Sequence, residues 1–169
     1  MRRRVEPLRA VVAVALLAAP GLAAGQEHDP GILQAVTAAY AGISANEGEA
    51  RDWQGFQELF VPGAQLIQVR GNAEEGFVPQ TMTVAEWTVA NMGWLEGRGF
   101  VEDAVHHRVE SYGPVAHVFT SWVTRQERGG EERSRGAATL QLVQTPEGWR
   151  VANWIWTGEV DGVPLPRGG

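Results

Sequence analysis

Hydrophobic side chains recur in the first part of the chain at the three- and four-residue spacing of an amphipathic helix. The first such stripe follows Asp29-Pro30 and consists of Ile32, Val36, Tyr40 and Ile43. Asp is a favoured N-cap and Pro a favoured first helical residue. The pattern predicts a helix that begins at Pro30 and ends before Asn46, with this stripe buried.

Two further helices and one strand are expected before residue 100. Asp52 precedes a short apolar helix that contains Trp53, Phe56, Leu59 and Phe60. The capping-box sequence Thr83-Val84-Ala85-Glu86 predicts a third helix, which ends near Gly97. Between these helices, Gln65 to Arg70 is expected to form a strand and Gly71 to Gln80 a polar loop.

From Phe100 onward apolar and polar residues alternate with a period of two, which predicts antiparallel strands. The strands are expected at about 100–112, 115–127, 135–144 and 149–158. The predicted fold class is α+β, with the element order α-α-β-α-β-β-β-β. A long antiparallel sheet of this kind curls into a cone, with the three helices packed on its concave side.

Three local patterns lie within this order of elements. They are Arg51-Asp52-Trp53 through Leu59-Phe60, Arg108 through Phe119 (RVESYGPVAHVF), and Arg135-Gly136 followed by Leu140-Gln141-Leu142 and Gly148-Trp149-Arg150-Val151. They resemble the second helix and two sheet hairpins of SnoaL-like members of the nuclear-transport-factor-2-like superfamily. The resemblance covers roughly residues 30 to 158.

This resemblance implies a cone with a ligand-sized cavity, often paired into a dimer through the sheet. It implies a fold more than a reaction, because the superfamily includes ketosteroid isomerase, scytalone dehydratase, polyketide cyclases and members without known activity.

The first 25 residues have the pattern of an export signal. Met1 to Arg4 is a positive segment, Ala10 to Ala19 is a short apolar run, and Ala23-Ala24-Gly25 provides small residues for cleavage. We therefore expect residues 1–25 to be a signal peptide, residues 26–169 to form one domain that begins at Gln26, and the protein to be periplasmic or secreted. The last residues, from Pro164, are expected to form a loose tail.

Charge and residue types exclude several classes of function. The formal net charge is -6, and removal of the signal's four Arg and one Glu leaves -6 - 4 + 1 = -9. This acidic balance argues against nucleic acids and anionic membranes as partners. The chain has no Cys and no Lys, so thiolate, Schiff-base and GxxxxGK chemistry are impossible. No cofactor is expected.

Strand parity predicts which residues face the cavity. If Gly113-Pro114 is a two-residue turn, Glu110 pairs with His117 and Glu102 with Arg125 on an outer, charged face. The opposite face then lines the cavity with His107, Asp103, Thr120 and Trp122. Continued across the next two turns, with Tyr40 added from the first helix, the predicted lining also includes Arg135, Thr139, Gln141 and Asn153.

A second register remains open. If the Gly129-Gly130 loop is longer, a slip of one residue places a different set inside, namely Leu140, Leu142, Trp154 and Trp156. In the first register these four residues and Phe119 form an apolar patch on the outer face. Such a patch is typical of an interface, so the first register predicts a homodimer through the outer sheet face.

His107 and Asp103 are the candidate catalytic residues. His107 is a candidate general base, or a partner of Thr120 in a simple hydrogen bond. Asp103 is a candidate proton shuttle, or an ion-pair partner of Arg135, because an unpaired buried carboxylate is costly. Neighbouring His106 and His107 point to opposite faces and cannot share a metal, so no metal site is expected.

Three functions are compatible with this cavity. The first is an exported protein that binds a compact, partly apolar small molecule with a carbonyl or carboxylate. The second is a cofactor-independent isomerase, cyclase or dehydratase that uses His107, with Asp103 or Arg135 polarising the substrate. The third is a dimeric interaction module without activity.

Overall fold

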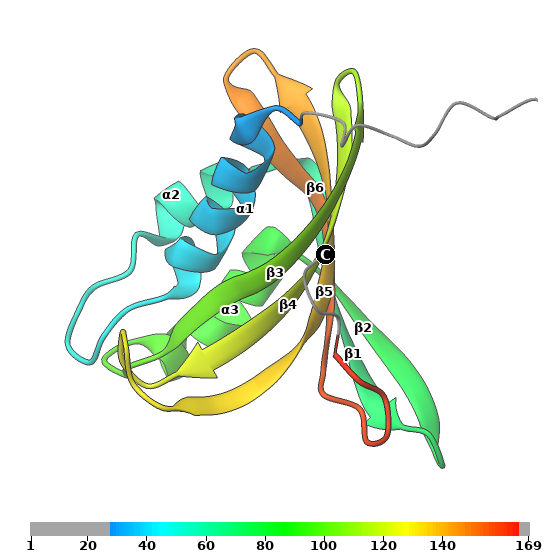
Figure 1. Cartoon of the computed structure of the whole chain (residues 1–169). Coiled ribbons are helices and arrows are strands. Elements are labelled where there is room, and N and C mark those ends of the chain that lie inside the picture. The colour runs from blue at the N-terminus through cyan, green and yellow to red at the C-terminus, as the bar shows by residue number, and fades with distance from the viewer. Residues whose placement is uncertain (1–27, 166–169) are drawn as a thin grey trace, which may run out of the picture.

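The protein forms one curved sheet whose concave side carries three helices (Figure 1). The structure, a computed structural model, describes residues 28–165, so the predicted signal peptide and the last four residues of the predicted tail lie outside the described residues. The predicted α+β class and element order are confirmed, with one strand added. Within the described part, no helix is long and apolar enough to cross a membrane.

Each helix begins at the cap that the sequence predicts. The helices are α1 (Pro30–Ile43), α2 (Trp53–Glu58) and α3 (Val84–Leu95). The carboxylates of Asp29 and Asp52 each accept a first-turn backbone N–H at 2.8 Å. Thr83 and Glu86 form the full capping box, with the Glu86 carboxylate accepting from the Thr83 N–H at 2.8 Å. These contacts satisfy backbone donors that a helix start leaves unpaired.

The sheet has six strands in the spatial order β2-β1-β6-β5-β4-β3. Their bounds are β1 Phe60–Asn72, β2 Gly76–Thr83, β3 Val101–Tyr112, β4 Val115–Arg125, β5 Glu132–Thr145 and β6 Gly148–Gly158. All neighbouring pairs are antiparallel except β1 and β6, which run parallel.

Strand β2 replaces most of the polar loop expected at residues 71–80. It pairs with β1 in a hairpin that projects beyond the helices (Figure 1). The turn is built by Asn72, whose side-chain oxygen accepts the N–H groups of Glu74 and Glu75 at 2.9 Å. Asn in this role is a strong turn former. The polar residues that suggested a loop therefore belong to an exposed edge strand.

The register between β3 and β4 changes at Val105. His107 pairs with Thr120, as predicted, but Glu102 pairs with Thr124 and not with Arg125. Val105 is the extra residue of a β-bulge, which shifts the pairing of all preceding residues by one. Because strand side chains alternate, residues 101–104 face opposite to the prediction.

The bulge moves Asp103 to the outer face, and the ion pair predicted for Asp103 forms with a different arginine. Glu102, and not Asp103, faces the concave side. Asp103 lies on the outer face, where its carboxylate contacts the Arg125 guanidinium at 2.8 Å. Arg135, the partner expected for Asp103, instead pairs with Glu159 at 3.4 Å.

The favoured register between β4, β5 and β6 is also wrong, and the alternative is the one found. Strand β5 begins at Glu132, after a loop over residues 126–131, and Val118 pairs with Leu140, which pairs with Trp154. The concave face therefore receives Leu140, Leu142, Trp154 and Trp156. Burying a large apolar side chain contributes about 1.5–3 kcal/mol, whereas the predicted parity would have placed charged and amide groups beneath the helices.

This register also removes the outer patch predicted to support a homodimer. Leu140, Leu142 and Trp154 are each at most 4 % exposed in the core. Of the predicted patch, Phe119 is left on the outer face. The homodimer stays a prediction, without the residues that motivated it.

Candidate functional site

The concave face holds a cavity of about 220 Å³ between the sheet, α2 and α3. Five of the protein's seven Trp residues line it: Trp87, Trp94, Trp122, Trp154 and Trp156. Phe56, Leu66 and Phe100 add further apolar surface. The polar lining comes from Gln68, Arg70, Asn91 and Glu102. The cavity is thus an aromatic box with a few polar groups, the composition typical of a small-molecule site.

A glycine on β5 lies behind one of the lining Trp residues. Gly136 lies beside Trp122 in the ladder, and a Cβ atom built on Gly136 would be 2.4 Å from the Trp122 ring. The indole therefore lies directly against the β5 backbone. In the ladder between β5 and β6, Gly136 pairs with Gly158 and Ala138 pairs with Trp156, so small residues lie beside two of the lining Trp side chains.

Among the described residues that line the cavity, Glu102 provides the one carboxyl group. Burial, with a smaller effect from neighbouring Asp103, raises the pKa of Glu102 to about 8. Its side chain is partly exposed because it lines the cavity, although it lies deep in the protein. Among residues 28–165 its carboxyl group has no hydrogen-bond partner. At pH 7 most molecules therefore carry a neutral carboxyl group that is available to a ligand.

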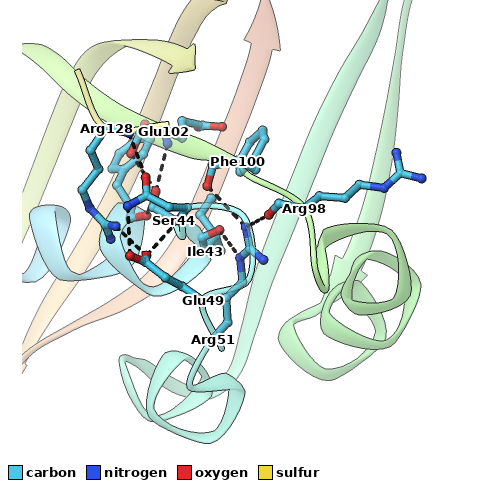
Figure 2. Close-up of polar contacts among 10 residues, drawn as sticks. Ile43, Ser44, Glu49, Arg51, Arg98, Phe100, Glu102 and Arg128 are labelled. Atoms are coloured by element: carbon cyan, nitrogen blue, oxygen red, sulfur yellow. Dashed lines mark hydrogen bonds and ion pairs between the residues drawn. The ribbon is translucent and has the colours of Figure 1, made fainter. Parts of the chain in front are cut away.

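Ser44 fixes the backbone of Glu102 (Figure 2). Its hydroxyl oxygen accepts the Glu102 N–H at 2.9 Å and lies 3.1 Å from the Glu102 carbonyl oxygen. The same hydroxyl donates to the Tyr40 carbonyl oxygen at 2.7 Å. The C-terminal end of α1 is therefore joined to the start of β3 at the carboxyl-bearing residue.

Arg51 ties three segments together next to this contact (Figure 2). Its guanidinium donates to the carbonyl oxygens of Ile43 at 2.8 Å, Arg98 at 3.2 Å and Phe100 at 3.3 Å, and also to that of Leu95. These carbonyls belong to the ends of α1 and α3 and to the segment that leads into β3. The planar guanidinium of Arg51 thus connects the ends of α1 and α3 with the segment before β3, at one end of the cavity.

Tyr40, predicted to bind ligand, is buried on α1 and packs edge-on against Trp154 with ring centroids 4.8 Å apart. Burial and the nearby Glu102 raise the pKa of Tyr40 well above the usual value. The Trp154 indole N–H, which lies toward the Tyr40 hydroxyl, lowers this pKa by a smaller amount. Neither the Tyr40 hydroxyl nor the Trp154 Nε1 completes a hydrogen bond within the described chain. Tyr40 lines a neighbouring pocket that also contains Ser44 and Glu102, so Glu102 lies between the two hollows.

Three other predicted residues face the concave side. Trp122 lines the cavity. His107 and Thr120 pair as predicted, but neither belongs to the cavity lining. Burial, followed by the charge of His106, lowers the pKa of His107, and its Nδ1 is buried without a hydrogen-bond partner within residues 28–165.

The remaining predicted site residues lie on the outer face. They are Asp103, Arg135, Thr139, Gln141 and Asn153. Thr139 is hydrogen-bonded to His117, and Gln141 pairs with Asn153 in the ladder. The sequence prediction missed Glu102, Gln68 and Arg70. Gln68 and Arg70 follow the buried Leu66 at every second position of β1, so all three lie on one face of the strand. This alternation is the pattern in the sequence that could have identified them.

Residues 28–165 contain no cluster of three or more His, Asp or Glu side chains placed to hold a metal ion.

Comparison with known proteins supports the fold and leaves the chemistry open. No family model and no curated protein matches the chain. A nuclear-transport-factor-2-like protein of unknown function from Pseudomonas putida aligns with a TM-score of 0.58 at 12 % identity, over 78 % of this chain and 86 % of that one. A nuclear-transport-factor-2-like protein with a cystatin-like fold from Novosphingobium aromaticivorans aligns at 0.53 and 18 % identity, over 79 % of each chain.

A third similar structure is a nuclear-transport-factor-2-like superfamily protein from Salmonella enterica, with a TM-score of 0.52 at 16 % identity over 80 % of this chain and 94 % of that one. The chain thus has the nuclear-transport-factor-2-like fold expected from its sequence.

Proposed function

We propose that this protein is an exported binding protein for a small, partly apolar molecule that occupies the cavity beside Glu102. One observation carries the proposal, namely an aromatic box to which the described residues contribute a single carboxyl group, whose pKa is raised to about 8. A neutral carboxyl donates a hydrogen bond to a carbonyl oxygen, and indole faces pack against rings. The volume of about 220 Å³ is below the roughly 300–1,000 Å³ of drug-sized sites, so we expect a ligand of one or two rings.

The test is a thermal-shift screen against cyclic ketones, phenols and aromatic acids. A ligand at about 100 times its dissociation constant adds roughly 2.7 kcal/mol, which raises the melting temperature by several degrees. Glu102→Leu is expected to weaken binding of the hits at least about fivefold. The matched control is Asp103→Leu, which removes the adjacent carboxyl group from the outer face and should leave binding unchanged.

A screen without hits would contradict the proposal and favour the interaction module. Binding that survives Glu102→Leu unchanged would remove Glu102 from the site.

Glu102 also favours a second function, acid–base catalysis on the bound molecule. A general acid or base works best with a pKa near the operating pH, and the pKa of Glu102 is about 8. His107 was the sequence-based candidate, but it does not belong to the cavity lining. In the proposed step the ionised Glu102 takes a proton from the carbon next to a ligand carbonyl, and the neutral form returns one.

Proton exchange tests this second function directly. A ketone from the screen is incubated with the protein in D₂O, and deuterium at its α-carbon is followed by NMR. Catalysis predicts incorporation that Glu102→Gln abolishes while binding remains. Incorporation at the rate of buffer alone would limit the protein to binding.

We also propose that the protein is exported and that it forms a homodimer. The residues at 1–25 support export, with Gln26 as the first residue of the mature protein. Mass spectrometry of the protein recovered from an extracytoplasmic fraction tests this, and an intact Met1 would contradict it. Sedimentation tests the proposed homodimer.

A further inference from the structure

Arg70 is the second ionisable group that lines the cavity, together with Glu102. It lies on β1 with the parity of Leu66 and Gln68, so the three side chains follow one another along the concave face from the core to the surface. Leu66 is 1 % exposed, Gln68 is half-buried and Arg70 is exposed. The cavity therefore has an apolar inner part and a cationic rim.

The guanidinium of Arg70 has no carboxylate partner among residues 28–165. It donates a hydrogen bond to the Gln68 side-chain oxygen at 2.7 Å, and Gln68 also lines the cavity. By contrast, four other arginines are in ion pairs with acidic side chains: Arg108, Arg125, Arg128 and Arg135. An unpaired cation at a cavity rim is available to a ligand.

Glu102 does not neutralise this cation. It belongs to β3, and Arg70 belongs to β1, which lies on the other side of β4, β5 and β6 in the sheet. Burial holds the pKa of Glu102 at about 8, so most of its carboxyl groups are neutral at pH 7. The lining then carries a charge close to +1 in a protein whose formal net charge is -6. This local reversal of sign favours an anion at the rim.

We infer that the ligand is a cyclic carboxylate, with its ring inside the Trp-lined box and its carboxylate on Arg70. This inference rests on the proposed binding function and specifies the ligand class. The planar guanidinium matches a carboxylate in a two-point contact. Asn91 lies in the same lining, and its side-chain nitrogen donates to the Trp87 carbonyl at 2.8 Å, which holds the amide in place beside the box.

Matched acid and amide pairs test the inference. The probes are benzoate with benzamide, phenylacetate with phenylacetamide, and indole-3-acetate with indole-3-acetamide. Each pair differs in charge and shares its ring. Dissociation constants are measured by ligand-observed NMR at pH 7 with the full chain. We expect the acid of at least one pair to bind roughly fivefold to tenfold more tightly than its amide, and 0.5 M NaCl to reduce this preference.

The variants assign the preference to one residue. Arg70→Gln should abolish the preference for the acid over its amide, and Arg70→Lys should retain part of this preference. Arg135→Gln, which removes an equal charge from the outer face, should leave it unchanged. Circular dichroism confirms that each variant is folded.

The outcomes separate this inference from the proposed function. Equal binding of acids and amides, or a preference that survives Arg70→Gln, overturns the carboxylate inference and leaves the binding function in place. Failure of all six probes to bind at 20 mM overturns the inference and counts against the binding function as well.

Discussion

The Ser44 hydroxyl accepts the backbone N–H of Glu102 at 2.9 Å, although 58 residues separate the two in sequence. This contact anchors the residue that supplies the cavity's carboxyl group to the end of α1. The start of β3 is anchored further by a backbone bridge in which the N–H groups of Ala45 and Phe100 each donate to the other's carbonyl oxygen, at 2.8 and 2.9 Å. The position of the carboxyl group is thus set by the helix layer as well as by the sheet.

Ser44→Ala is expected to destabilise the protein by about 1–3 kcal/mol, because it leaves a partly buried backbone N–H without an acceptor. The measurement is the free energy of unfolding in urea. Thr81→Ala, a hydroxyl removal on the exposed strand β2, is the matched control and should change it by less than about 0.5 kcal/mol. Equal effects in the two variants would show that Ser44 does not anchor Glu102.

Glu102 should make stability depend on pH. Its pKa is raised from 4.5 to about 8 in the folded state, so the native protein retains a proton that the unfolded chain has released. The contribution of Glu102 to the free energy of unfolding should therefore be greatest below pH 4.5 and fall as the pH rises toward 8, by at most about 1.4 kcal/mol per pH unit.

Glu102→Gln should remove this contribution while other titrations persist. The difference in unfolding free energy between wild type and Glu102→Gln is the quantity to measure, at intervals from pH 4 to pH 9. Asp103→Asn serves as the neighbouring control. A difference that stays constant with pH, or that grows in favour of wild type, would mean that the Glu102 carboxyl group is not held neutral.

Arg51→Met should cost about 2–4 kcal/mol of stability, because it leaves several carbonyl oxygens at the ends of α1 and α3 without their donor. Arg51→Lys should retain a minor part of the stability that Arg51→Met loses, since an ammonium group cannot reproduce the planar set of donors of a guanidinium. Urea denaturation measures both. The control is Arg108→Met on the outer face, where both partners of the ion pair are largely exposed. If Lys restores full stability, charge alone matters at this position.

Gly136→Ala is expected to displace the Trp122 indole, which lines the cavity. Its Cβ would lie 2.1 Å from the Thr157 carbonyl oxygen and 2.4 Å from the Trp122 ring. The backbone cannot yield easily, so the loss should be about 1–3 kcal/mol with a changed near-ultraviolet circular dichroism spectrum from Trp122.

Gly158→Ala is the matched control, because Gly158 pairs with Gly136 across the ladder and its Cβ would meet no atom within 4 Å. A near-wild-type stability and spectrum for Gly136→Ala would show that the indole does not lie against this glycine.

Local patterns determined the helices and most of the strands. Asp29, Asp52 and Thr83 cap helices through contacts that span two or three residues, so the sequence next to each cap contains the whole interaction. The period of two after Phe100 likewise identified the four strands from residue 100 onward. The turn at Gly113-Pro114 paired Glu110 with His117 correctly, because a two-residue turn leaves little freedom of register.

The tertiary structure alone decided which side chains enter the cavity. The bulge at Val105 turns Glu102 inward and Asp103 outward. The loop over residues 126–131 sets which face of β5 is buried, and a register shift at Ala152 in β6 turns Trp154 inward and Asn153 outward. These choices depend on pairing between strands and on packing beneath the helices. Because side chains alternate, a difference of one residue exchanges the two faces completely. The sequence by itself therefore determined the elements and their order, and packing between distant segments determined the chemistry of the site.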